Sequence, residues 1–194
     1  MWQKFYEKHR TNGLELLSVA VDVQGASVVK LFVKKFDVSF PVAVDTADTF
    51  GERFGLKVVP VSFLIDELGI IRLSGGGPTT EFLRKIESIL KEPIISSISA
   101  EKSGKTLTPD QSSKTNAIGY HVYAAHLLLQ QGRTNEATAN LRQALVLDPS
   151  NWRIRKQIWA VENPDKFYSA DKPDSDWQKD QIKREQSKAR TPSP

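Results

Sequence analysis

Few residue types that can do chemistry occur in this sequence, and their spacing excludes several kinds of site. The 194 residues contain no cysteine, so they supply no disulfide, thiolate metal site, iron–sulfur cluster or cysteine nucleophile. The histidines, His9, His121 and His126, show no spacing typical of metal ligands, such as HxxxH. We interpret His121 and His126 as partly exposed helix residues. The sequence therefore predicts no metal and no cofactor.

Four aspartates and a run of glycines stand where a metal or a phosphate is sometimes held. Asp22, Asp45, Asp48 and Asp66 lie at the expected ends of strands or helices, and turn and capping roles explain them more simply than a metal does. The glycines at 75–77 follow an expected strand but lack the GxGxxG or GK[ST] spacing. We therefore assign neither a metal nor a phosphate to these residues.

The composition indicates a globular protein with at least one core. Apolar residues make up 39% and charged residues 26% of the chain, which is ordinary for soluble domains. The net charge of +4 comes from interspersed residues rather than one basic block, so no nucleic-acid partner is expected. No apolar run approaches the ~20 residues that span a bilayer, and the first residues do not resemble a secretory signal.

Hydrophobic patterning predicts strands and helices in alternation over the first half of the chain. The expected strands lie at 14–21, 41–44, 58–65 and 70–73, and the expected helices lie at 26–36, around Phe50 and Phe54, and at 79–91. The unbroken apolar run at 14–21 predicts a strand buried on both faces of a parallel sheet. The turn at 66–69 predicts an antiparallel hairpin, and Thr79 or Thr80 is expected to cap the last helix.

The second half has a different character. Residues 92–116 lose periodicity and gather Ser, Lys, Thr and Pro, which predicts a linker. Three helices are expected beyond it, at 117–131, 134–147 and about 150–161. Apart from Trp177, residues 169–194 are mostly polar, and we expect disorder or a single frayed helix there.

Four segments of the first half resemble the TlpA/ResA redoxin group of thioredoxin-fold proteins. They are LLSVAVD at 16–22, FPVAVD at 40–45, GLKVVPVSFLID at 55–66 and GIIRLSGG at 69–76. The resemblance implies an α/β, thioredoxin-like domain over residues 1–91. In that family the proline that matches Pro60 is a cis-proline at the active site, so Val59 and Pro60 are implied to face a substrate. The alternative is that Pro60 only marks an edge strand or a bulge.

The sequence departs from this family at its beginning. The family begins with a strand and a WCxxC segment that opens the first helix, whereas residues 1–10 here resemble only the rest of that helix, with Trp2, Phe5, Tyr6 and His9 on one face. Because a helix N-terminus lowers a thiol pKa, the family's nucleophile belongs in that segment. We therefore expect a thioredoxin-like domain that is incomplete at the N-terminus, with Met1 an internal or misassigned start or the gene a remnant. The missing strand would leave about 4.8 Å of sheet unfilled.

The tail resembles one tetratricopeptide repeat. Gly132, Ala137, Leu141, Ala144 and Pro149 have the spacing of such a repeat, and the small residues allow paired helices to approach. In the first helix of the repeat, Ala124 and Ala125 replace the usual Leu-Gly pair. We expect a small α-helical, TPR-like hairpin over 117–168 that is capped by a segment containing Trp152 and Trp159. It is either a docking or dimerisation surface or, as we favour, a hairpin packed on its own domain.

Together these features predict a thiol-disulfide oxidoreductase family member whose CxxC redox centre is absent from the chain. Without a thiol it is expected to be inactive by itself and limited to binding a peptide or protein partner. The alternative is a non-catalytic adaptor that uses the thioredoxin-like surface and the TPR-like helices. The family resemblance implies a periplasmic or other extracytoplasmic location, but we recognise no signal peptide or membrane anchor in these residues.

Overall fold

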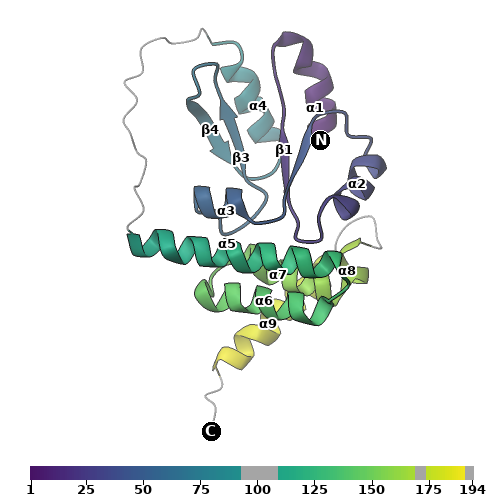
Figure 1. The fold of residues 1–194 in the computed structure, drawn as a ribbon. Coiled ribbons are helices and arrows are strands. Elements are labelled where there is room, and N and C mark those ends of the chain that lie inside the picture. The colour runs from purple at the N-terminus through teal and green to yellow at the C-terminus, as the bar shows by residue number, and fades with distance from the viewer. Residues whose placement is uncertain (93–108, 169–173, 191–194) are drawn as a thin grey trace.

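The first half of the chain alternates helices and strands (Figure 1). The computed structural model describes residues 1–92, 109–168 and 174–190. The elements of the first half are α1 (Trp2–His9), a 3₁₀ turn η1 (Arg10–Asn12), β1 (Ser18–Val21), α2 (Ala26–Lys35), β2 (Val42–Asp45), α3 (Thr49–Phe54), β3 (Ser62–Ile65), β4 (Ile71–Gly75) and α4 (Thr80–Ile89).

The four strands form two separate pairs within the described residues. Strand β1 pairs in parallel with β2, with Ser18 opposite Val42, and β3 pairs antiparallel with β4, with Ser62 opposite Gly75. The predicted parallel pairing and hairpin are therefore confirmed. No described strand pairs with the second edge of β1 or of β3, so both edges offer unpaired backbone groups.

Two predicted strands are shorter in the structure. β1 begins at Ser18 rather than Leu14, and Leu17 is 62% exposed, so the expectation of a strand buried on both faces is wrong. β3 begins at Ser62 rather than Val58, because residues 58–60 leave the ladder. The Val59–Pro60 peptide bond within them is cis.

The helices α1 and α4 cover the β3–β4 hairpin. Their shared core contains Phe5, Leu14, Phe82 and Ile86, and Trp2, Leu64, Leu73 and Leu83 pack against it. The predicted cap of α4 is confirmed, because the Thr79 hydroxyl accepts a hydrogen bond from the Phe82 amide at 3.2 Å.

The second half is entirely helical where it is described. It contains α5 (Pro109–Gln130), α6 (Thr134–Leu147), α7 (Trp152–Glu162), α8 (Pro164–Tyr168) and α9 (Ser175–Arg190). The expected linker is helical from Pro109. Proline suits the first turn of a helix, but the polar residues that follow it have the composition of a linker, so the sequence does not indicate this helix. The rest of that predicted linker, 93–108, lies outside the described residues. None of the described helices is long and apolar enough to span a membrane.

The described part of the polar tail is helical. Residues 175–190 form α9, and the Trp177 ring lies 6.0 Å from the ring of Trp159 and 6.1 Å from that of Phe167. Residues 169–173 and 191–194 of that predicted tail lie outside the described residues. The aromatic cluster thus anchors an otherwise polar helix by edge-to-face packing.

The helical half packs against the ends of β1 and β2 (Figure 1). Val23, just after β1, is 2% exposed and belongs to the core formed by α5, α6 and α7. The Gln157 side chain accepts from the Val23 amide at 2.9 Å and donates to the Val21 carbonyl at 3.0 Å. His126 Nδ1 lies 2.9 Å from the Val23 carbonyl oxygen. The helices are therefore packed on the chain's own first half.

Candidate functional site

Three exposed aromatic side chains lie where α3 leads into β3. Phe50, Phe54 and Phe63 are 44%, 53% and 40% exposed. The Phe54 ring lies 5.6 Å from the Phe50 ring and 6.0 Å from the Phe63 ring, between centroids. We call these three side chains the aromatic row. Exposed apolar side chains that lie together are a common feature of surfaces that bind other molecules.

The segment 58–60 lies in the loop between α3 and β3. The contact between the Phe54 and Phe63 rings joins the two ends of this loop. Val58 and Val59 are 54% and 45% exposed, and Pro60 is exposed as well. Among the described residues, no hydrogen bond reaches the backbone groups of this segment. Its amides and carbonyls are therefore available to an extended chain laid alongside it.

The glycines at 75–77 lie close to this segment. A Cβ atom at Gly77 would lie 3.3 Å from Pro60 Cγ, and the Ser62 hydroxyl donates to the Gly76 carbonyl at 2.8 Å. The glycine run thus allows close approach of the backbone to Pro60.

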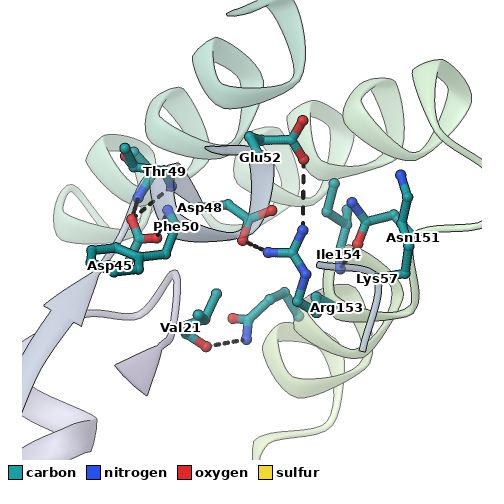
Figure 2. Close-up of polar contacts among 12 residues, drawn as sticks. Val21, Asp45, Asp48, Thr49, Phe50, Glu52, Lys57, Asn151, Arg153 and Ile154 are labelled. Atoms are coloured by element: carbon teal, nitrogen blue, oxygen red, sulfur yellow. Dashed lines mark hydrogen bonds and ion pairs between the residues drawn. The ribbon is translucent and has the colours of Figure 1, made fainter. Parts of the chain in front are cut away.

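Asp45 holds the beginning of α3. Its carboxylate accepts hydrogen bonds from the backbone amides of Thr49 at 2.9 Å and Phe50 at 2.7 Å, as Figure 2 shows. The predicted capping role is confirmed for this aspartate. External support of this kind matters because α3 has only six residues, and a helix this short is not stable in isolation.

Arg153, from α7, anchors the other side of α3 (Figure 2). Its guanidinium forms an ion pair with Asp48 and lies 3.7 Å from the Glu52 carboxylate. Arg153 is 3% and Asp48 2% exposed. Burial lowers the pKa of Arg153 to about 10, against the opposing effect of the nearby Asp45 charge, so the side chain stays charged at neutral pH.

The role expected for Asp48 needs correction. Its side chain makes no capping hydrogen bond to α3, although Asp45, Asp66 and Asp22 do accept turn or cap hydrogen bonds from nearby amides. Asp48 is instead a buried ion-pair partner for a residue far along the sequence. The local sequence signals of a turn cannot predict this ion pair, because the pair forms only when the two halves of the chain pack together.

The residues proposed from the sequence fall into two places. Val59 and Pro60 lie at the surface beside the aromatic row, whereas Ala137, Leu141 and Ala144 have 0% exposure inside the helical core. The remaining ones are Gly132 at the α5–α6 turn with φ of 74°, exposed Pro149, partly buried Trp152 and buried Trp159. Arg153 and the aromatic row were missed, since neither has a distinctive spacing.

Asp22 is a partly buried acid at the junction of the two halves. Its carboxylate accepts hydrogen bonds from the Gln24 amide at 2.9 Å and the Tyr168 hydroxyl at 3.2 Å. Burial raises the pKa of Asp22 despite these hydrogen bonds. A carboxyl with a raised pKa in the folded state contributes stability at low pH that is lost as pH rises through that pKa.

Replacing Asp22 with Asn is therefore expected to raise the melting temperature at pH 7, since Asn keeps an acceptor without the buried charge. A gain of about 1 kcal/mol would correspond to about 2–4 °C for a chain of this length. The gain should shrink as the pH falls from neutrality toward 4, where the wild-type carboxyl takes up its proton. Thermal unfolding followed by circular dichroism at several pH values measures both effects, and a lower melting temperature for the variant at pH 7 would contradict the argument.

The first half of the chain is similar to a known family of proteins. The sequence model of the AhpC/TSA family matches residues 1–74. The thiol-disulfide oxidoreductase ResA of Bacillus thuringiensis subsp. konkukian (strain 97-27) is 34% identical over 88 residues, which cover 43% of this chain and 50% of that protein. The sporulation thiol-disulfide oxidoreductase A of Bacillus subtilis (strain 168) is 30% identical over 81 residues, which cover 41% and 49%.

These matches are confined to part of each protein. The chain spans about half the length of the curated relatives it matches. No solved structure gives a significant match to it. The family model lies within the α/β half.

Proposed function

We propose that this chain, a TlpA/ResA-like thioredoxin-fold protein, binds an extended polypeptide segment on the surface formed by the aromatic row and residues 58–60. The observation that carries the proposal is the exposed apolar segment whose backbone groups have no partner among the described residues. Val59 and Pro60 are its centre, and the aromatic row supplies apolar contact. The open edge of β3 lies immediately after this segment, so a bound chain can continue as an added strand.

In this proposal the chain presents a substrate and does not itself exchange a disulfide. The two relatives described above are thiol-disulfide oxidoreductases by name, but these 194 residues contain no thiol. A thiolate is the nucleophile of such exchange. Any cysteine that acts on the bound segment therefore lies outside these residues.

The test uses a fluorescein-labelled nine-residue peptide of alternating valine and threonine as the probe. Fluorescence anisotropy should show that the intact chain binds it, and Val59→Asp should weaken binding by about tenfold or more, or ~1.4 kcal/mol. The reason is that a charge at position 59 must lose water when the apolar peptide covers it. The matched control is Val146→Asp on α6, where Val146 is 70% exposed and binding should not change.

A second version of the peptide, N-methylated at alternate amides, tests the mode of binding. Methylation on the edge that faces the protein removes the donors for strand addition, so binding should be lost with one methylation pattern and kept with the other. Equal binding of both patterns, or of wild type and Val59→Asp, is incompatible with the proposed function.

The second candidate function is an adaptor that uses the helical half. Tyr120, Tyr123 and Leu127 are 71%, 48% and 44% exposed, and their spacing places them on one face of α5. The α5–α6 hairpin would then act as a TPR-like repeat over the proposed region 117–168, next to a thioredoxin-like region over 1–91. Tyr123→Ala should weaken partner binding if this face is used, whereas Val59→Asp should not.

A further inference from the structure

We infer that Arg153 is a positioning residue: from the helical half, it holds α3 so that the aromatic row can receive the bound polypeptide. This inference rests on the proposed function and adds that the helical half controls the shape of the binding surface. Arg153 is itself buried and is not one of the exposed residues of that surface; its ion pairs are with Asp48 and Glu52.

The spacing of residues along α3 gives the helix two functional sides. Glu52, within α3, and Asp48, the residue just before the helix, both contact the Arg153 guanidinium. Phe50 and Phe54 each lie two residues from Glu52 along the helix, which is more than half a turn. One side of α3 is therefore fixed to α7, while the other displays two rings of the aromatic row.

Gly51 makes this attachment possible. It is buried in α3, and a Cβ atom at this position would overlap the Arg153 guanidinium. Glycine is otherwise unfavourable within a helix, so its presence here is explained by the room that the arginine needs. The fit depends on both residues, and a change in either should disturb α3.

Other contacts hold α3 as well, since it also lies against α5. Asp45 holds the amides at the beginning of the helix, and Lys57, which pairs with Asp148 of the helical half, follows its end. Because α3 is too short to persist unaided, loss of the Arg153 contact should leave Phe50 and Phe54 without a fixed direction. A fixed direction reduces the entropy lost on binding.

The experiment compares the affinity of the valine–threonine probe for four full-length chains at a temperature where circular dichroism shows each to be folded. Arg153→Met should weaken binding by about tenfold, and Arg153→Lys, which keeps the charge but not the planar fork, by an intermediate factor. Ile158→Ala is the control, since Ile158 lies on the same helix in the core. It should lower the melting temperature and leave the affinity within about twofold of wild type.

A second readout does not require the probe. In protein labelled with 4-fluorophenylalanine, the ¹⁹F resonances of Phe50 and Phe54, assigned with Phe50→Leu and Phe54→Leu, should broaden or shift in Arg153→Met and Gly51→Ala but not in Ile158→Ala. If Arg153 only stabilised the fold, Ile158→Ala would change the fluorine spectrum to the same extent as Arg153→Met.

The outcomes separate this inference from the proposed function. Wild-type affinity in Arg153→Met, with wild-type fluorine spectra, overturns the positioning role and leaves the proposed function standing. Absence of probe binding by the wild-type chain overturns the proposed function, and the fluorine spectra then still decide whether Arg153 orders α3. If Arg153→Met does not fold, the affinity and the fluorine spectrum of Arg153→Lys decide the inference in the same way.

Discussion

Replacing Asp48 with Asn is expected to lower the free energy of unfolding by about 3–5 kcal/mol, because it leaves the charge of Arg153 buried with a poorer partner. Both side chains are almost inaccessible to water, and the Glu52 carboxylate is 3.7 Å away, too far for a good charge-assisted hydrogen bond. Asn also tolerates the left-handed backbone of Asp48, where φ is 59°. The substitution therefore tests the charge and not the backbone.

Urea unfolding followed by far-ultraviolet circular dichroism measures the effect of Asp48→Asn. The control is Asp148→Asn, which weakens the pair between the buried Asp148 and Lys57, a side chain that is 51% exposed. Because water reaches the lysine, this loss should be clearly smaller than the loss in Asp48→Asn. Equal losses for the two variants would show that the Arg153 pair is no more important than the half-exposed Lys57 pair.

Replacing Leu141 with Ala is expected to cost about 2–5 kcal/mol, through the lost burial and the cavity left behind. Leu141 has 0% exposure at the centre of the helical core. Val23 of the first half belongs to the same core, and Gln157 bonds to the backbone on both sides of it. We therefore expect the two halves to unfold together, so that Leu141→Ala lowers the stability of both.

Amide hydrogen exchange read by mass spectrometry tests this coupling. Peptides covering β2 and peptides covering α6 should lose the same opening free energy in Leu141→Ala. Val146→Ala, on the exposed side of the same helix, should change it by less than about 0.5 kcal/mol. Loss of protection in α6 alone would mean that the halves are independent.

The sequence predicts the fold best where local signals agree with the packing. The bounds of α6 match the prediction from Gly132 and the Asp148-Pro149 stop. The β3–β4 hairpin follows from its turn, where the Asp66 carboxylate accepts hydrogen bonds from the amides of Leu68 at 3.0 Å and Ile70 at 2.9 Å. Both features depend on neighbours in the chain, which periodicity and turn chemistry describe well.

Predictions fail where distant residues decide the structure. The start of α5 at Pro109 is hidden by Ser and Thr residues that also suit a linker. An arginine near the start of a helix is usually assigned to solvent, so its burial against Asp48 and Gly51 has no local signal. The aromatic row is likewise visible only once the structure shows which phenylalanines remain exposed, since exposed and core phenylalanines share the same patterns.

The proposed binding surface is tested most directly by its location. In a ¹H–¹⁵N spectrum of the 194-residue chain titrated with the valine–threonine probe, we expect the largest shifts on amides between Phe50 and Phe63. Shifts concentrated instead on Tyr120, Tyr123 and Leu127 of α5 would place binding on the helical half and rule out the aromatic row as the binding surface.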